Sequence, residues 1–134
     1  MRRKARRVVV AGSSSFPLTP EVGGEVVEIL RGYPEETVFL TRGSPGFDTF
    51  IVRATAIIQR PCVRYPSLGG SKNWDRDVAM VREADEVLVF FDPETLHDEN
   101  TGTAHIAAKG LDQKKKVMAY SVAGNRLVYV GSTD

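Results

Sequence analysis

Cysteine is nearly absent from this sequence, since Cys62 is the only one among 134 residues. A lone cysteine excludes an internal disulfide framework, and with no secretory leader pattern we expect the reducing environment of the cytoplasm. We expect Cys62 itself, in a short apolar strand, to belong to the core.

Strong net charge and long apolar runs are absent as well. The formal net charge is +1 at pH 7, so no global field directs the protein to a nucleic acid or a membrane. No run approaches the roughly 18 apolar residues of a membrane span, and we expect no membrane partner. The one local excess of charge, residues 2–7, is either a solvated tail or an arm that contacts the phosphates of a polynucleotide.

Two phosphate-binding motifs and any metal motif are also missing. No Gly-Lys-Ser/Thr occurs, and the first loop has only Gly12 where the dinucleotide fingerprint has three glycines. Neither a P-loop NTPase nor a standard NAD enzyme is supported, and we expect no cofactor. His97, Asp98, Glu99 and His105 have ligand chemistry but no recognised metal spacing, so we expect no metal site.

What the sequence does contain is an alternation of apolar strands and helical segments. The run 87–91 is apolar throughout, which is typical of a central parallel strand covered on both faces. Strands that alternate with helices predict right-handed βαβ units, and the short turn at 123–125 predicts an antiparallel edge hairpin. We therefore predict one doubly wound, Rossmann-like, three-layer α/β domain over 7–134, mostly parallel, after a basic tail at 1–6.

Local signals set the expected elements. The expected strands are 7–11, 37–41, 61–65, 87–91, 116–120 and 127–130. Thr19-Pro20 starts the first helix, Ser44-Pro45 the second, and Thr101 the fourth, which Gly110 ends. The third helix is expected over 73–84, with these residues on or near its buried side: Trp74, Val78, Met80 and Val81. In the fourth helix the residues at helical spacing are Ala104, Ala107, Ala108 and Leu111.

Three loops, 12–16, 42–48 and 92–103, follow the first, second and fourth strands. The carboxyl ends of parallel strands share one edge of a sheet, where α/β proteins bind ligands, so we expect these loops to meet. Their small and hydroxyl residues permit close approach to an anion, and the helix opening at Thr101 offers free N–H groups. The candidate ligand-binding residues are Gly12, Ser13, Ser14, Arg42, Gly43, Ser44, Gly46, Asp48, Arg76, Asp92, Thr101, Gly102 and Thr103.

Several of these residues have two interpretations that the sequence leaves open. Asp48 bonds a ribose hydroxyl or caps the helix it precedes, and Arg76 clamps a phosphate or is solvated or paired with an acidic neighbour. Asp92 and Glu99 are candidate catalytic carboxylates for N-glycosidic cleavage, or parts of a solvated acidic loop. Trp74 stacks on a base or packs in the protein.

Four short motifs together resemble the YspA-type branch of the SLOG superfamily. They are Gly12-Ser13-Ser14, Gly43-x-x-Gly46-x-Asp48, Arg76-Asp77-x-x-Met80 and Gly102-Thr103, and the resemblance covers nearly the whole chain. SLOG proteins are Rossmann-like and include the LOG phosphoribohydrolases and the DNA-processing DprA proteins. The resemblance implies a homodimer that pairs through helix faces and a nucleotide-type pocket lined by Gly12, Ser13, Gly43, Gly46, Asp48, Arg76, Gly102 and Thr103.

The chain also departs from the family pattern. Arg42-Gly43 stands where Gly-Gly is usual, and Arg76-Asp77 where Arg-Asn is frequent. The LOG motif P-G-G-x-G-T-x-x-E places a catalytic glutamate where this chain has Ile106. We therefore expect a domain that binds a nucleotide-derived small molecule, as a sensor or sequestering protein. The alternatives are a nucleotide N-glycosidic hydrolase and, less favoured, a DprA-type binder of single-stranded DNA.

Overall fold

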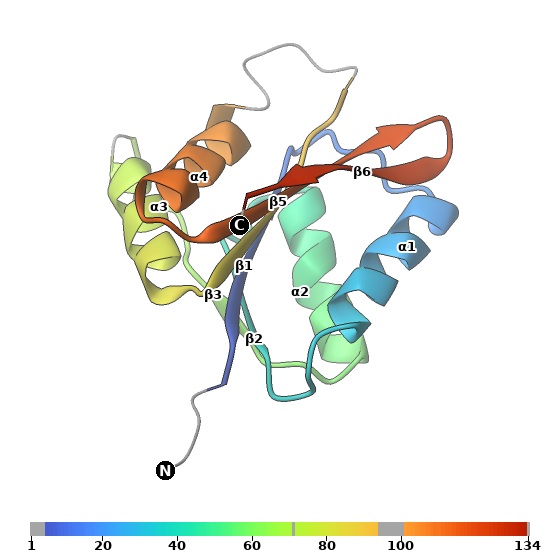
Figure 1. Ribbon diagram of the computed structural model, residues 1–134, viewed down its shortest axis with the longest axis horizontal. Helices are drawn as coiled ribbons and strands as arrows, with labels where there is room; N and C mark the ends of the chain where they lie inside the picture. The colour runs from blue at the N-terminus through green and yellow to red at the C-terminus, as the bar shows by residue number, and fades with distance from the viewer. Residues whose placement is uncertain (1–4, 71, 94–100, 134) are drawn as a thin grey trace.

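The computed structural model describes residues 5–70, 72–93 and 101–133, which form three layers with one sheet between two pairs of helices (Figure 1). The strands are β1 (Arg7–Gly12), β2 (Val38–Thr41), β3 (Cys62–Arg64), β4 (Glu86–Phe90), β5 (Lys116–Ala123) and β6 (Arg126–Ser132). The helices are α1 (Pro20–Arg31), α2 (Phe47–Ile57), α3 (Lys72–Glu83) and α4 (Thr101–Asp112).

The predicted fold class is confirmed. The sheet has the order β3-β2-β1-β4-β5-β6, with every neighbouring pair parallel except β5 and β6. The chain runs outward from β1 to β3 and then returns to β4 on the other side of β1. This reversal creates a topological switch point between β1 and β4, at the edge where ligands of such folds bind.

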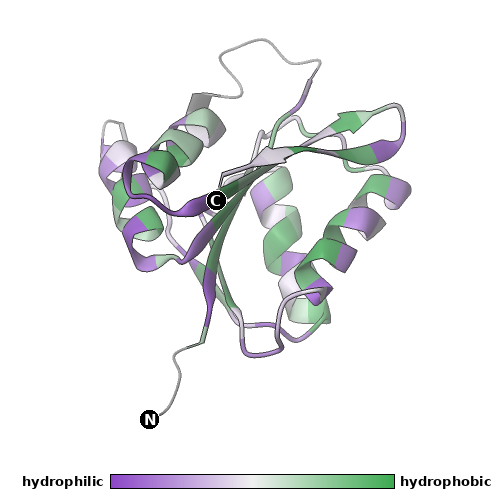
Figure 2. Ribbon diagram, viewed as in Figure 1, coloured by the Kyte–Doolittle hydropathy of each residue, from purple (hydrophilic) through white to green (hydrophobic). Residues whose placement is uncertain are grey.

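Alternating side chains of the central strands build two cores. Val8 and Val10 of β1 join the core under α1 and α2, whereas Val9 joins the core under α3 and α4. All five residues of β4 are buried, which confirms it as a strand covered on both faces. The hydrophobic colouring in Figure 2 accordingly follows the middle of the sheet and the helix faces turned toward it.

The first helix begins where its sequence predicts. Thr19 is the N-cap, and its Oγ1 accepts a hydrogen bond from the amide of Val22 at 3.1 Å. Gly32 ends the helix with a right-handed backbone and donates its amide to the carbonyls of Glu28 and Ile29. A Cβ on Gly23 would lie 3.4 Å from the ring of Phe50, an ordinary van der Waals contact, so the packing of α1 on α2 does not require glycine there.

Two predicted helix boundaries are wrong. α2 begins at Phe47 with Gly46 as N-cap rather than at Ser44-Pro45, because the backbone of 43–46 is needed for a loop contact described below. α4 continues through Gly110 to Asp112, so Gly110 is not a stop. A Cβ on Gly110 would lie 2.7 Å from Cγ2 of Val117, which shows that glycine is required there for packing against the sheet.

The buried faces of α3 and α4 also differ from those that their spacing indicates. Trp74 is 45% exposed, although Met80 and Val81 are buried as predicted. In α4 the buried residues are Thr103, Ile106 and Gly110, whereas the predicted Leu111 is exposed. The buried face is therefore shifted by one residue toward the amino end from the predicted one. Alanine gains little from burial, so its spacing is a weak guide to the face that meets a sheet.

We predict opposite effects for two glycine substitutions. Gly110→Ala should lower the free energy of unfolding by up to about 2 kcal/mol, because overpacking against Val117 costs about 1–3 kcal/mol and better helix propensity returns only ~1 kcal/mol. Gly24→Ala should raise it by about 0.5–1 kcal/mol, because a Cβ there meets no atom within 4 Å. Urea denaturation measures both, and equal effects of the two substitutions would contradict the close approach of α4 to β5.

We also predict a pH dependence for the one thiol. Cys62 is partly buried in the edge strand β3, less than the expected core position, and burial raises the pKa of its thiol. Its alkylation by iodoacetamide should therefore reach half-maximal rate above the pH of about 8.5 that is usual for cysteine. The urea-unfolded chain is the control, and the same midpoint in both states would contradict the burial.

Candidate functional site

The described parts of the three predicted loops do meet at the carboxyl edge of the sheet. The amide of Ser13 donates to the carbonyl of Phe90 at 3.0 Å, which ties the loop after β1 to the end of β4. Nη2 of Arg42 donates to the carbonyl of Gly12 at 2.9 Å, and a Cβ on Gly102 would lie 2.8 Å from Nη1 of the same arginine. Arg42 therefore lies at the junction of all three loops.

A buried ion pair joins Arg42 to Asp48. Nε of Arg42 donates to Oδ2 of Asp48 at 2.9 Å, and the two side chains are 9% and 1% exposed. Asp48 also accepts the amides of Gly12, at 3.3 Å, and of Ser44. Burial raises the pKa of Asp48, against the opposing effects of the Arg42 guanidinium and these amides. The carboxylate of Asp48 therefore accepts hydrogen bonds from the protein itself. It is not the N-cap of α2, and it is not open to solvent.

The glycines of the loops allow this close arrangement. Gly46 has a φ of 87°, and a Cβ there would lie 2.3 Å from the carbonyl oxygen of Ser14. A Cβ on Gly12 would lie 2.4 Å from the ring of Phe47. Gly43, with a φ of 72°, lies against the guanidinium of Arg64. These glycines are thus explained by close contacts with the first loop, the start of α2 and the end of β3.

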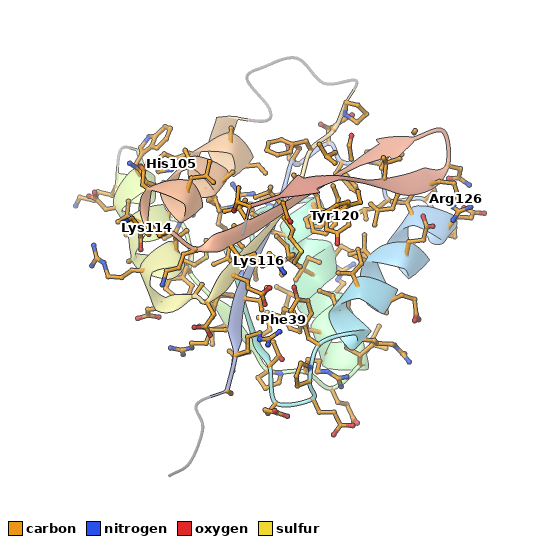
Figure 3. All side chains as sticks on the ribbon, viewed as in Figure 1. Phe39, His105, Lys114, Lys116, Tyr120 and Arg126 are labelled. Carbon is orange, nitrogen blue, oxygen red and sulfur yellow. The ribbon has the colours of Figure 1, made fainter. Side chains whose placement is uncertain are left out.

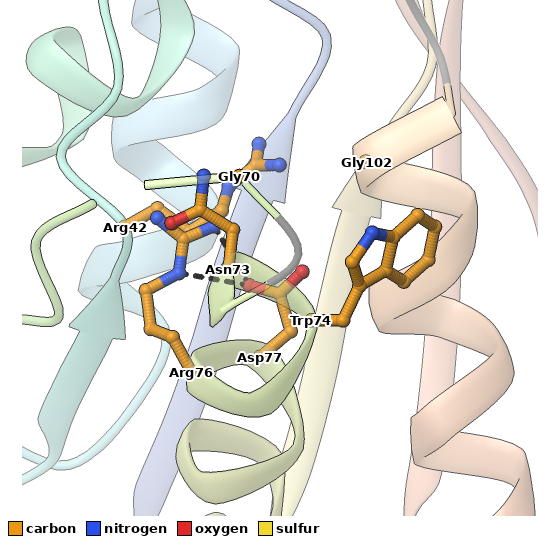
Figure 4. A pocket seen from close by; sticks show the side chains of 7 residues that line it. All are labelled: Arg42, Gly70, Asn73, Trp74, Arg76, Asp77 and Gly102. Atoms are coloured by element: carbon orange, nitrogen blue, oxygen red, sulfur yellow. Dashed lines mark hydrogen bonds and ion pairs between the residues drawn. The ribbon is translucent and has the colours of Figure 1, made fainter. Parts of the chain in front are cut away.

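Beside the ion pair lies a pocket of about 280 Å³, lined by Arg42, Gly70, Asn73, Trp74, Arg76, Asp77 and Gly102 (Figure 4). It lies where the amino ends of α3 and α4 approach the carboxyl end of β2. Of the residues predicted to bind ligand, it brings together Arg42, Arg76 and Gly102. The amino ends of both helices add positive electrostatic potential at this position.

Asp77 contacts both Arg76 and His105 at the pocket. Its Oδ1 accepts hydrogen bonds from Nε and Nη2 of Arg76, at 3.1 and 2.9 Å. Its Oδ2 lies 3.2 Å from Nδ1 of His105, which projects from α4 toward α3 (Figure 3). Arg76 is therefore buried and paired, one of the two states that the sequence left open. Each of the two arginines has one aspartate partner, so their formal charges balance.

Trp74 forms the remaining wall of the pocket. Its indole contacts the ring of His105 edge to face, with the ring centroids 3.7 Å apart. Nearly half of the residue is nevertheless exposed, on the side of α3 that faces α4. An aromatic surface is thus available within the same pocket as two guanidinium groups.

Asp92 lies in a different pocket. That hollow, of about 360 Å³, is lined by Ser15, Pro17, Asp92, Pro93, Val122 and Gly124. It lies between the first loop, the end of β4 and the turn of the β5–β6 hairpin. The other candidate catalytic residue, Glu99, lies outside the described residues, as do His97 and Asp98. The structure therefore separates Asp92 from the two arginines.

The remaining predicted residues lie around the pocket rather than in it. Ser13 is buried beside the ion pair, and Ser14 and Ser44 belong to the loops that contact it. Thr103 is buried, and its Oγ1 has no hydrogen-bond partner. Thr101 begins α4, but only its backbone is described.

Sequence reasoning missed Gly70, Asn73 and Asp77 as pocket residues. β3 is also a parallel strand, so the loop that follows it and the start of α3 return to the same edge of the sheet. An expectation of binding residues after every parallel strand, including β3, would have identified these three residues.

The fold and this edge pocket define a Rossmann-like α/β domain. Neither family models nor curated proteins give a match to the chain. Within the described residues, no group of three or more His, Cys, Asp or Glu side chains could hold a metal ion. None of the helices in this part of the chain is long and apolar enough to cross a membrane.

We predict that the Arg42–Asp48 pair is a large contributor to stability. Asp48→Ala should lower the free energy of unfolding by about 3–5 kcal/mol, because it leaves a buried guanidinium unpaired. The double variant Arg42→Met, Asp48→Leu should lose less, since it removes both charges. Asp75→Ala on the exposed face of α3 is the control and should change stability by less than about 1 kcal/mol in urea denaturation. An equal loss in the control and Asp48→Ala would contradict this role.

Proposed function

We propose that this protein binds a small nucleotide-derived ligand in the pocket between Arg42, Arg76 and the amino end of α4, as a sensor or sequestering domain. The observation that carries the proposal is the pair of buried arginines that face one pocket at the carboxyl edge of a Rossmann-like sheet. Guanidinium groups are well suited to bind phosphate oxygens by paired hydrogen bonds.

The two arginines are held in place before any ligand arrives. Arg42 is fixed through Nε and Nη2 by Asp48 and Gly12, and its Nη1 lies next to Gly102 at the start of α4. Arg76 is fixed through Nε and Nη2 by Asp77. Side chains that are already ordered lose little conformational entropy on binding, which favours affinity for a small anion.

Glycine at 102 supports the same conclusion. Its missing side chain opens the first turn of α4 to Arg42, and the first amides of a helix have no partner within the helix. A phosphate there would receive hydrogen bonds from an arginine and from backbone amides together. The motifs that resemble the SLOG superfamily imply the same class of ligand.

Binding is favoured over hydrolysis because two positions that could supply a catalytic carboxylate do not do so in this pocket. Ile106, at the position of the LOG glutamate, is fully buried in the core under α3 and α4. Asp92 lines the other pocket.

The proposal predicts selective stabilisation by phosphate-bearing ligands. AMP, ADP, cyclic AMP and ADP-ribose should be compared with adenosine in a thermal unfolding assay. A binding ligand at 100 times its dissociation constant should add about 2.7 kcal/mol of stability, whereas adenosine should add none at the same concentration. If no phosphate-bearing compound raises the melting temperature, the proposal is wrong.

A second prediction concerns Arg76 itself. Arg76→Lys keeps the positive charge but loses the planar fork, and it should weaken the binding of the best phosphate ligand by about 10- to 100-fold in calorimetric titration. Arg82→Lys, on the exposed surface of the same helix, is the matched control and should leave affinity unchanged. Unchanged affinity in Arg76→Lys, with the fold verified by circular dichroism, would exclude this pocket as the site.

A further inference from the structure

We infer that Trp74 is a stacking wall for an aromatic base, so that the ligand of this pocket is a single nucleotide. This inference rests on the proposed function, and it goes further by assigning the base a place and limiting the size of the ligand. The evidence is the arrangement of α3 residues around the pocket (Figure 4).

Trp74 and Arg76 point to opposite sides of the pocket. Residues two apart on a helix do not share a face. Arg76 accordingly extends toward Arg42 and the β2 side, whereas the indole of Trp74 extends toward α4 (Figure 4). A ligand lying across the amino end of α3 would thus have guanidinium groups at one end and an aromatic surface at the other.

Polar groups occupy the space between these ends. Asn73 accepts the amide of Leu68 through Oδ1 at 2.8 Å, which leaves its Nδ2 to donate. Asp77 lies one turn later on the same helix and also lines the pocket. A donor and a carboxylate between an anion site and an aromatic surface match the ribose that joins a phosphate to a base.

The exposure of Trp74 is otherwise unexplained. A tryptophan buries a large apolar area when it packs in a core, yet this one is 45% exposed on a helix whose Met80 and Val81 are fully buried. The edge contact with His105, which is itself held by Asp77, fixes the indole on one side. Trp74 is thus linked to Arg76 through His105 and Asp77.

The volume of the pocket limits the ligand. Pockets for drug-sized molecules are commonly about 300–1,000 Å³, and this one, at about 280 Å³, lies just below that range. One base, ribose and phosphate can be accommodated, whereas a dinucleotide would extend beyond it. Stacking of a base on an aromatic side chain contributes about 1–3 kcal/mol, which corresponds to roughly 5- to 150-fold in affinity.

The test compares AMP, ribose 5-phosphate and the dinucleotide ApA by calorimetric titration. AMP should bind about 5- to 150-fold more tightly than ribose 5-phosphate, and ApA no more tightly than AMP. Because Trp74 is the only tryptophan, AMP should also quench the intrinsic fluorescence of the protein, and ribose 5-phosphate should quench it much less.

Three variants test whether Trp74 causes the difference in affinity between AMP and ribose 5-phosphate. Trp74→Ala should reduce the affinity for AMP to that for ribose 5-phosphate and leave the latter unchanged, with Trp74→Phe between the wild type and Trp74→Ala. Tyr129→Ala removes an aromatic residue of similar exposure from β6 and should change neither affinity. Circular dichroism verifies the fold of each variant, and Trp74→Phe provides the test if Trp74→Ala proves unstable.

The outcomes separate this inference from the proposed function. Equal affinities for AMP and ribose 5-phosphate, unchanged in the Trp74 variants, would overturn the stacking wall and leave phosphate binding intact. Failure of every phosphate compound to bind would overturn the proposed function and the inference together. Tighter binding of ApA or of a single-stranded oligonucleotide than of AMP would overturn the limit to one nucleotide.

Discussion

The geometry of the site depends on the buried ion pair between Arg42 and Asp48. It uses the amide and the carbonyl of Gly12 as well, so one pair of side chains holds the ends of β1 and β2 together. A buried charge without a partner is strongly destabilising, so loop conformations that separate Arg42 from Asp48 are disfavoured. The glycines at 12, 43 and 46 allow the same loops to pack closely, since a Cβ there would collide with Phe47, Arg64 and Ser14 respectively.

This pair also affects where the proposed ligand would bind. The amide of Gly12, at the switch point where many α/β folds bind an anion, is already bonded to Asp48. The pocket that Arg42 lines lies on the α3 and α4 side, together with Arg76 and Trp74. The proposed site is thus displaced from the first loop toward the amino ends of the two helices.

Much of the fold follows from signals within a few residues of each other. The apolar run of β4, the Thr19-Pro20 helix start and the hairpin turn before β6 are all found as predicted. The errors arise where a residue's role depends on a distant neighbour. Gly110 has the sequence of a helix stop but is required by Val117, and Trp74 has the spacing of a core residue but lies on a pocket wall.

The sequence by itself determined the order of strands and helices, the parallel sheet with its edge hairpin, and the edge at which loops gather, because periodicity and turn chemistry are local properties. Only the tertiary structure decided which polar groups are already paired and which face open space. Asp48 meets Gly12 across 36 positions of the chain, and Asp77 meets His105 across 28. Such contacts are set by how the layers pack, and it is this packing that places two arginines, an asparagine and a tryptophan around one pocket.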